Sequence, residues 1–291
     1  MADKPRVNLA TTNKIEFYLD YTFRKLFCLW YEVKKPKLKF FIFEMIYSFM
    51  KIIDRKCMFI SPFNIDYVQT KFGNFIVRPK TTDLVVVSPA YERKDLDKLI
   101  EIIDYHLKQN KKVLFIDVGS NIGSYSIAIG NAYKNIDTLH IMSIEAAKEN
   151  FDLLKKNVYL NKLENKITLI NATLADLPDK TINFSFNKKV PGCSGVSSCN
   201  DEDYVIEQLK TTTLDLIIQN HHNFDVCIIK IDVEGYEIEI LKGAEKLLNS
   251  KKEIYLLVED FIKLESIEFI KKRGFVHLAK LTPYNSWWKK I

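Results

Sequence analysis

From Val113 onward, short apolar runs alternate with longer segments in which apolar residues recur at helical spacing. The runs are continuous, which is typical of parallel strands that helices cover on both faces. They predict strands at Val113–Val118, Leu139–Glu145, Ile167–Asn171, Val226–Asp232 and Glu253–Glu259. Helices are predicted at Ser124–Tyr133, Lys148–Leu160, Thr213–Asn220, Glu237–Asn249 and Phe261–Arg273. The pattern therefore predicts an α/β fold with a doubly wound, mostly parallel sheet.

Residues 61–110 predict a small β unit followed by a helix. Asp66–Thr70 and Asn74–Arg78 flank Gly73 and favour a hairpin. Leu84–Val87 predicts a short strand, and Asp95–Gln109 predicts an amphipathic helix. No element is predicted for the polar stretch between the third and fourth strands, Lys180–Asn200.

Residues 1–60 are aromatic and basic, and predict helices over about 12–32 and 38–55, broken at Lys35-Pro36. The stretch 38–53 is apolar nearly all round, but it is too short and too interrupted by charge to span a bilayer. Two interpretations stay open for residues 12–55. They pack on the sheet domain or on a second subunit, or they dock on a membrane surface through the nearby Lys34, Lys35, Lys37 and Lys39.

Composition separates these regions further. The 291 residues are 47% apolar and 27% charged, as in a globular protein, and allow one large domain plus an extension. We divide them into residues 1–60, residues 61–110 and a catalytic domain at 111–291. The net charge of +6 comes from residues 1–60, since 61–291 hold 31 basic and 31 acidic residues. No broad phosphate-binding surface is implied, so no DNA partner is expected.

The five cysteines are far apart and form no CxxC pair, and no secretory segment follows Met1. Such usage is typical of a reducing compartment. We therefore expect a cytoplasmic protein, with contact to a membrane surface as the alternative.

The first predicted strand runs into a glycine turn that reads Asp117-Val-Gly119-Ser120-Asn121-Ile-Gly123-Ser124. Glycines let the backbone approach a ligand, and the free N–H groups of a helix that begins at Ser124 suit a carboxylate. Nucleotide-like ligands bind at this edge of an open α/β sheet. The turn has one glycine too few for a dinucleotide site. The acid at its start suits a ligand that carries a cationic sulfonium and an amine.

The ends of the next two strands add candidate ligand contacts. Glu145, followed by Ala146, can accept hydrogen bonds from two ribose hydroxyls, in NAD or in S-adenosylmethionine. The alternative is an exposed acid at a helix start, favoured by the helix dipole. The third strand ends at Asn171-Ala172, where an adenine edge is commonly bound.

The fourth strand carries charge. Alternation places Lys230, Asp232 and Glu234 on one side of it, which is costly unless these groups are paired or functional. Either Lys230 pairs with Asp232 while Glu234 caps the next helix, or Asp232 and Glu234 face an acceptor and a methyl donor.

These segments resemble the FkbM-type methyltransferases, a class I S-adenosylmethionine-dependent family, over about Phe72 to Leu278. The resemblance is carried by Phe115-Ile-Asp-Val-Gly-Ser-Asn-Ile-Gly123, Ile144-Glu145-Ala146, Thr213-Leu-Asp215, Lys230-Ile-Asp-Val-Glu-Gly-Tyr-Glu237, Leu241-Lys-Gly-Ala244 and Glu259-Asp260, with Gly73, Arg78-Pro79 and Tyr91-Glu92 upstream. It implies a Rossmann-like fold, S-adenosylmethionine as cofactor and O-methylation, often of sugars or natural products.

The resemblance also implies positions for the cofactor. The turn, through Asp117, Gly119, Ser120, Asn121, Gly123 and Ser124, would line its methionine end. Glu145 and Ala146 would hold the ribose, with Asn171 and Ala172 near the adenine.

Methyl transfer from a sulfonium requires the protein to align the acceptor oxygen and to remove its proton. Asp232 is the first candidate for the general base and Glu234 the second, with Lys230 steadying the charge. We expect a sugar, a glycan or another small molecule as the acceptor.

Several alternatives stay open at this stage. Asp232, Glu234, Glu259 and Asp260 could hold a divalent metal. Other functions are ribose 2′-O-methylation of RNA and a non-catalytic subunit with a methyltransferase fold. The loop Pro191–Ser198 is either a lid or clamp on the acceptor or a surface hairpin. Trp287-Trp288 either stacks on a sugar or anchors the chain terminus.

Overall fold

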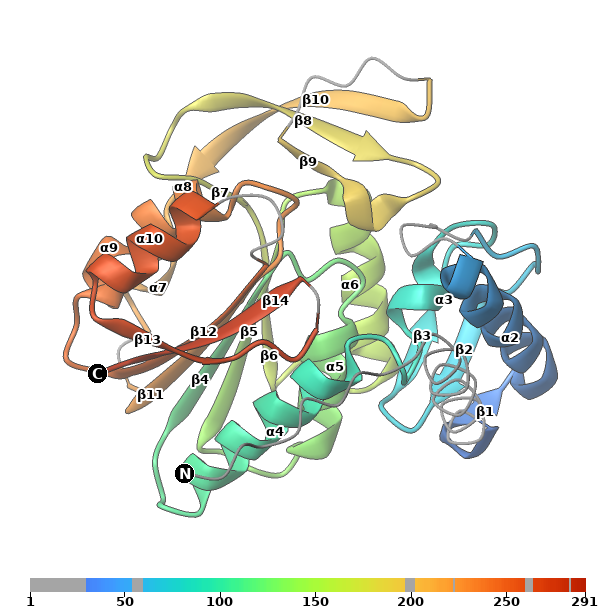
Figure 1. Ribbon diagram of the computed structural model, residues 1–291, viewed down its shortest axis with the longest axis horizontal. Helices are drawn as coiled ribbons and strands as arrows, with labels where there is room; N and C mark the ends of the chain where they lie inside the picture. The colour runs from blue at the N-terminus through green and yellow to red at the C-terminus, as the bar shows by residue number, and fades with distance from the viewer. Residues whose placement is uncertain (1–29, 54–59, 197–201, 222, 260–263, 283) are drawn as a thin grey trace, which may run out of the picture.

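A seven-stranded sheet forms the centre of the protein (Figure 1). The computed structural model describes residues 30–53, 60–196, 202–221, 223–259, 264–282 and 284–291. The strand order is β13-β14-β12-β11-β4-β5-β6. The strand β14 runs in the direction opposite to all the others. The strands are β4 (Val113–Val118), β5 (Leu139–Glu145), β6 (Ile167–Asn171), β11 (Val226–Ile231), β12 (Glu253–Glu259), β13 (Phe275–Ala279) and β14 (Asn285–Lys290).

The chain winds outward from β4 in both directions. It runs first through β5 and β6, then crosses to β11 on the other side of β4 and continues to β12. β4 and β11 therefore adjoin at the point where the strand order reverses, which is where open α/β sheets bind ligands. The predicted doubly wound, mostly parallel sheet is confirmed.

Alternate residues of β4 explain the helix layers. Val113 and Phe115 belong to one buried apolar cluster, whereas Leu114 and Ile116 belong to another. The first cluster includes residues of α4 (Arg93–Leu107), α5 (Ser124–Ala132) and α6 (Lys148–Leu160). The second includes residues of α7 (Leu214–Ile218), α8 (Glu237–Lys242), α9 (Glu245–Leu248) and α10 (Leu264–Lys272). Both faces of the sheet are thus covered, as the continuous apolar runs predicted.

The helix predicted at Glu237–Asn249 is interrupted between α8 and α9. A Cβ atom on Gly243 would lie 2.0 Å from the carbonyl oxygen of Ala175, so this position packs against another segment. The carboxylate of Asp215 then accepts the backbone N–H groups of Lys246 and Leu247 and starts α9. This interruption depends on contacts that are distant in sequence.

A second, four-stranded sheet follows β6, and two of its strands come from the stretch Lys180–Asn200, for which no element was predicted. It has the order β7-β10-β8-β9, with β7 (Thr173–Leu174), β8 (Thr181–Asn187), β9 (Gly195–Val196) and β10 (Tyr204–Thr212). The short 3-10 helix η1 (Pro191–Cys193) precedes β9. Phe184 and Phe186 of β8 pack against Ala147, and Figure 1 shows this sheet at one end of the large sheet.

The N-terminal part described here forms a small unit of its own. β1 (Val33–Lys35), β2 (Tyr67–Thr70) and β3 (Asn74–Ile76) form an antiparallel sheet, which confirms the predicted hairpin. α2 (Lys37–Ile53) packs against it through Phe40 and Phe43. No described helix is both long and apolar enough to cross a bilayer. The predicted helix at 12–32 lies almost entirely outside the described residues.

The strand predicted at Leu84–Val87 is wrong, because this stretch belongs to the short helix α3 (Asp83–Val86). The buried carboxylate of Asp83 accepts hydrogen bonds from the backbone N–H and the guanidinium of Arg78. It also lies beside Thr81, whose hydroxyl accepts the Asp83 N–H. These polar contacts tighten the chain into a helical turn despite its β-branched residues.

The two terminal tryptophans lie on β14 and point to opposite faces of the sheet. Trp287 belongs to one core cluster and Trp288 to the other, and both are almost fully buried. Their role as hydrophobic anchors of the terminus is confirmed, and neither has surface free to stack on a sugar.

The same pair allows a matched stability test. The indole N–H of Trp287 donates to the buried carboxylate of Asp95 at 2.8 Å, whereas that of Trp288 has no partner within the described residues. Replacing Trp287→Phe removes a hydrogen bond to a buried charged group, which costs about 2 kcal/mol. We expect this variant to lose that much more unfolding free energy than Trp288→Phe in urea titrations. Equal losses would show that the Asp95 contact contributes nothing.

Candidate functional site

The candidate site lies where β4, β5, β11 and β12 end. Its first component is the turn after β4, in which Gly119, Asn121 and Gly123 all have positive φ, at 75°, 50° and 93°. α5 begins directly after this turn, at Ser124. The turn thus points the N-terminus of a helix at the position where the strand order reverses.

The two glycines of the turn allow close packing within the protein, and their role in admitting a ligand stays a prediction. A Cβ atom on Gly119 would lie 1.9 Å from the carbonyl oxygen of Asp232, at the end of β11. A Cβ atom on Gly123 would lie 2.6 Å from a methyl group of Leu154 on α6. The neighbouring segments can therefore close against the turn only because these two positions lack a Cβ atom.

Asp117 lies beneath the turn, in the interior. Its carboxylate accepts a hydrogen bond from the hydroxyl of Ser126 at 2.6 Å, and Ser126 in turn accepts one from Ser143. Burial raises the pKa of Asp117, while Lys230 and Ser126 oppose this shift. The side chain supports the turn from below.

Glu145 is buried and tied to the same turn. Its two carboxylate oxygens accept the backbone N–H groups of Asn121, at 2.8 Å, and Ala147, at 3.0 Å. The alternative of an exposed acid at a helix start is therefore wrong. The amide of Asn171 donates to the carbonyl oxygens of Glu145 and Ala146, and the N–H of Ala172 also donates to that of Glu145. The predicted cofactor residues are thus one connected group.

The fourth strand contributes a buried ion pair. The Lys230 ammonium lies 2.9 Å from Asp232 and 3.8 Å from Asp117, and 5.1 Å from the ring centroid of Tyr125. The predicted Lys230–Asp232 pair is confirmed. Glu234 does not cap the next helix, because Glu237 accepts the N–H of Gly235 there.

Instead, Glu234 belongs to an acidic cluster. Carboxylate oxygens of Asp232, Glu234 and Glu259 all lie within 4.8 Å of one another. Partial burial and the charge of Asp232 raise the pKa of Glu234 to about 7. Burial and the charges of Asp232 and Glu234 raise the pKa of Glu259 to about 9, so Glu259 holds a proton at neutral pH. Asp260 lies outside the described residues.

Glu92 is a fourth acid that the sequence interpretation did not assign to the site. It precedes α4 in a left-handed conformation, with φ at 43°. Its carboxylate accepts hydrogen bonds from Tyr125 and from Asn285, both at 2.9 Å. Burial and the charge of Asp232 raise its pKa to about 7. Among the sequence features, only the family resemblance of Tyr91-Glu92 pointed to this position.

The segment Pro191–Val196 lies across the site. A Cβ atom on Gly192 would be 3.5 Å from the amide of Asn121, and one on Gly195 would be 3.4 Å from Glu234. The carbonyl oxygen of Pro191 accepts a hydrogen bond from Asn150. The segment predicted as a lid or clamp thus touches both the glycine turn and the acidic cluster; Ser197 and Ser198 lie outside the described residues.

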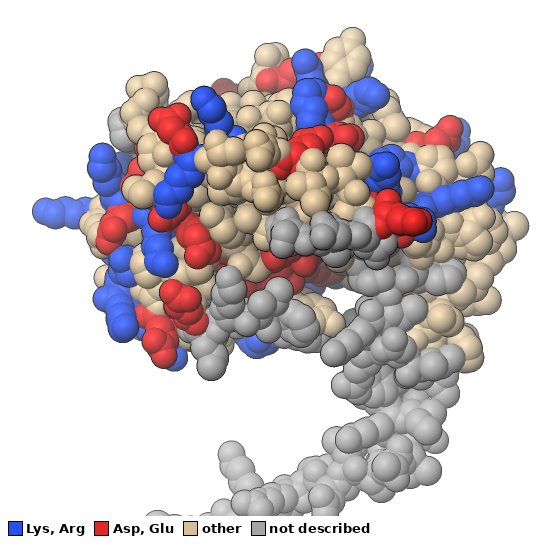
Figure 2. Space-filling model, turned by 90° about the horizontal axis from the view of Figure 1, so that it is seen from above, with Lys and Arg blue, Asp and Glu red and all other residues tan. Residues whose placement is uncertain are grey.

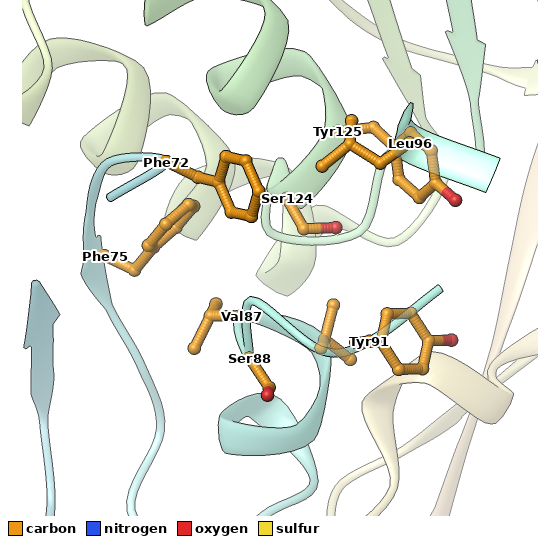
Figure 3. Close-up of a pocket in the computed structure, with 9 residues that line it drawn as sticks. Phe72, Phe75, Val87, Ser88, Tyr91, Leu96, Ser124 and Tyr125 are labelled. Carbon is orange, nitrogen blue, oxygen red and sulfur yellow. The ribbon is translucent and has the colours of Figure 1, made fainter. Parts of the chain in front are cut away.

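A small, mostly apolar pocket opens beside the start of α5 (Figure 3). Ser124 and Tyr125 form one wall, and Tyr91 forms another. The remaining lining residues come from the hairpin, α3 and α4: Phe72, Phe75, Val86, Val87, Ser88 and Leu96. The hairpin of β2 and β3, together with α3, therefore closes this pocket on the side of α4.

Comparison with known proteins identifies the family. Residues 117–279 match the methyltransferase FkbM domain, which is more than half of the chain. The chain belongs to this family of S-adenosylmethionine-dependent class I methyltransferases, and its sheet has the fold of that class. No protein of curated function matches the sequence.

Solved structures are similar to this chain only at the level of a distant fold. The precorrin-6y C5,15-methyltransferase from Geobacter metallireducens GS-15 is 15% identical, with 62% of this chain and 79% of that chain covered and a TM-score of 0.35. A SAM-dependent methyltransferase from Aquifex aeolicus is 13% identical, with coverages of 67% and 88% and a TM-score of 0.38. The N-terminal domain of human METTL16 in complex with SAH is 12% identical, with coverages of 94% and 92% and a TM-score of 0.39.

The close approach at Gly119 generates a prediction. Gly119→Ala and Gly274→Ala both place a Cβ at positive φ, but nothing lies within 4 Å of the Gly274 position. Left-handed strain of about 1–2 kcal/mol is therefore common to both variants, and only Gly119→Ala also displaces β11 from β4. We expect Gly119→Ala to weaken S-adenosylhomocysteine binding at least about tenfold in calorimetry, and Gly274→Ala to leave it unchanged. Equal effects would contradict this account of the turn.

Proposed function

We propose that this protein transfers the methyl group of S-adenosylmethionine to a hydroxyl of a sugar, a glycan or another small-molecule acceptor. One observation carries the proposal: the acidic cluster of Asp232, Glu234 and Glu259 adjoins the glycine turn through the contact between Asp232 and Gly119. A group that can remove a proton is thereby held next to the segment that would bind the methyl donor.

The turn and the second strand fit the donor. The carboxamide oxygen of Asn121 is buried and has no hydrogen-bond partner among the described residues, so it can accept an N–H from the amine of the donor. The free N–H groups at the start of α5 suit its carboxylate. Among the described residues, one carboxylate oxygen of Glu145 accepts one N–H, from Asn121, and keeps a lone pair for a ribose hydroxyl. The other accepts from the Ala147 N–H and, at 3.4 Å, from the amide of Asn150. Asn171 and Ala172 follow on the adenine side.

The charge balance of the site also fits this donor. Asp117, Asp232 and Glu92 approach the buried ammonium of Lys230, while Glu234 and Glu259 add further carboxyl groups. A ligand with a sulfonium and an amine brings positive charge to this edge, whereas a phosphate would be repelled.

Asp232 is suited to act as the general base. The bound donor supplies an activated methyl group, so the protein must orient the acceptor hydroxyl and take up its proton. Lys230 holds one carboxylate oxygen of Asp232, which leaves the other for the hydroxyl. As the acceptor oxygen forms its bond to the methyl carbon, the bond between that carbon and the donor sulfur would break and S-adenosylhomocysteine would leave. The hydroxyl proton would pass to Asp232, and Lys230 would stabilise nearby negative charge. Glu234 is the second candidate for this role.

The neighbouring carboxyl groups favour a polyhydroxylated acceptor. At neutral pH Glu259 is protonated and can donate a hydrogen bond, whereas Asp232 accepts them. Adjacent hydroxyls of a sugar can satisfy such groups together. An acceptor with a single hydroxyl would leave buried polar groups without partners, which is costly. Figure 2 shows basic and acidic side chains interspersed on the face viewed from above, without a continuous basic area for RNA.

Labelled S-adenosylmethionine offered with glycan, lipid-linked sugar and RNA acceptors tests the proposal. We expect label in a sugar acceptor, recovered as an O-methyl group. Label in RNA alone would replace this function with ribose methylation. Binding of S-adenosylhomocysteine without transfer to any acceptor would favour a non-catalytic subunit.

Asp232→Asn separates catalysis from binding. The amide keeps an oxygen for Lys230 but cannot take up the proton, so kcat should fall by about 10²–10⁴-fold. The affinity for S-adenosylhomocysteine in calorimetry should change by less than about threefold. Asp152→Asn, at an exposed position of α6, is the matched control and should retain full activity. An active Asp232→Asn enzyme would exclude Asp232 as the base.

The same three carboxylates could instead hold a divalent cation, because their oxygens lie close enough together to share one. In the proposed mechanism, Asp232 takes up the proton and Lys230 stabilises negative charge without a metal. We therefore expect methyl transfer to survive EDTA treatment and gel filtration within about twofold. A loss of activity that Mg²⁺ or Mn²⁺ restores would make the cluster a metal site.

A further inference from the structure

The outer face of α2 is apolar, contrary to the usual pattern of a surface helix. Its inner face packs on the small antiparallel sheet through Phe40 and Phe43, which are fully buried. On the opposite face Leu38, Met45 and Phe49 are 62%, 48% and 62% exposed. Ile42, which is half-buried, continues the same row at helical spacing. We call these four residues the α2 stripe.

Aromatic side chains extend this apolar surface at the start of the helix. Trp30 and Tyr31 are exposed, and the Trp30 ring packs edge-on against Phe41 at 5.3 Å. Tryptophan and tyrosine are enriched where proteins meet the headgroup region of a bilayer. A contiguous exposed apolar surface of this kind marks an interaction site.

Positive charge surrounds the same end of the helix. Lys34, Lys35 and Lys39 are exposed, and the ammonium of Lys37 lies 4.5 Å from the Trp30 ring centroid. Within residues 30–53, the two acids do not offset this charge at the surface. Glu44 is buried, and Glu32 is paired with Lys71 and Arg93. An apolar row with a basic rim therefore faces outward.

We infer that α2 is a docking surface for an anionic lipid membrane. In the docked state the helix lies in the plane of the interface, with the α2 stripe in the acyl boundary and the lysines on anionic headgroups. Contact with a second copy of this chain would use the stripe but would leave the basic rim without a role. The membrane explains both features. Figure 1 shows α2 at the margin of the molecule, away from the large sheet.

Flotation of the full-length protein with lipid vesicles tests this inference. We expect binding to vesicles that contain phosphatidylglycerol, little binding to pure phosphatidylcholine, and weaker binding at high salt. Met45→Ser with Phe49→Ser should weaken binding at least about tenfold, because the apolar contribution is lost. Tyr159→Ser with Leu177→Ser removes exposed apolar side chains elsewhere and should leave binding unchanged.

A matched pair of charge-reversal variants tests the basic rim. Charge reversal of Lys34, Lys35 and Lys39 to Glu should weaken binding to anionic vesicles at least about tenfold. Reversal of Lys155 and Lys156, exposed on α6, should have little effect. Binding that ignores both the lipid charge and these substitutions would overturn the inference.

Two further measurements complete the test. If Met45→Ser with Phe49→Ser converts a dimer to a monomer in light scattering while vesicle binding is absent, the stripe is a contact between two copies and the inference is wrong. The cofactor affinity of this variant should equal that of the wild type. The docking surface can therefore fail without any change in the proposed methyl transfer.

Discussion

The centre of this protein depends on one buried charge, the ammonium of Lys230, which interacts with two carboxyl groups. Lys230 on β11 stands opposite Asp117 on β4 in the sheet register, at the point where the strand order reverses. Its ammonium also reaches Asp232, one step beyond the strand. Although burial disfavours the charged form, Asp232 and Asp117 raise the pKa of Lys230. An unpaired charge at this depth would cost several kcal/mol, so each member of this group depends on the others.

The acids of the site can gather at one edge because of this lysine. Asp117 supports the glycine turn, Asp232 faces outward, and Glu92 approaches from α4. One ammonium does not balance all of these carboxyl groups. The pKa values of Glu92, Glu234 and Glu259 are raised first by burial and then by the remaining repulsion. A cationic methyl donor would relieve part of it. The repulsion between carboxyl groups that destabilises the ligand-free site therefore favours the binding of a cationic ligand.

Two further segments complete the site, one outside the central sheet and one on its antiparallel strand. The Pro191–Val196 segment reaches from the glycine turn to Glu234, and Asn285 on β14 holds Glu92 in place. Residues 117–279 carry the family pattern, but Glu92 and Asn285 lie on either side of it. The match over residues 117–279 therefore includes the cofactor turn, the strand ends and the Pro191–Val196 segment, while the contact between Glu92 and Asn285 lies outside it.

The five central parallel strands and the glycine turn were predictable from sequence, because continuous apolar runs and a turn with glycines are local patterns. β8 carried a signal too: Ile182, Phe184 and Phe186 alternate with polar residues, as in a half-buried strand, but the interpretation passed over it. Other features depended on distant partners. Leu84–Val87 looks like a strand, yet the contacts of Asp83 with Arg78 make it helical. Glu92 joins the site only because Tyr125 and Asn285, from two other elements, meet it there. Gly119 shows the division most clearly. The sequence determined that a glycine stands in the turn. Only the tertiary structure decided that this glycine makes room for the carbonyl oxygen of Asp232, because the contact joins strand ends that are 113 residues apart.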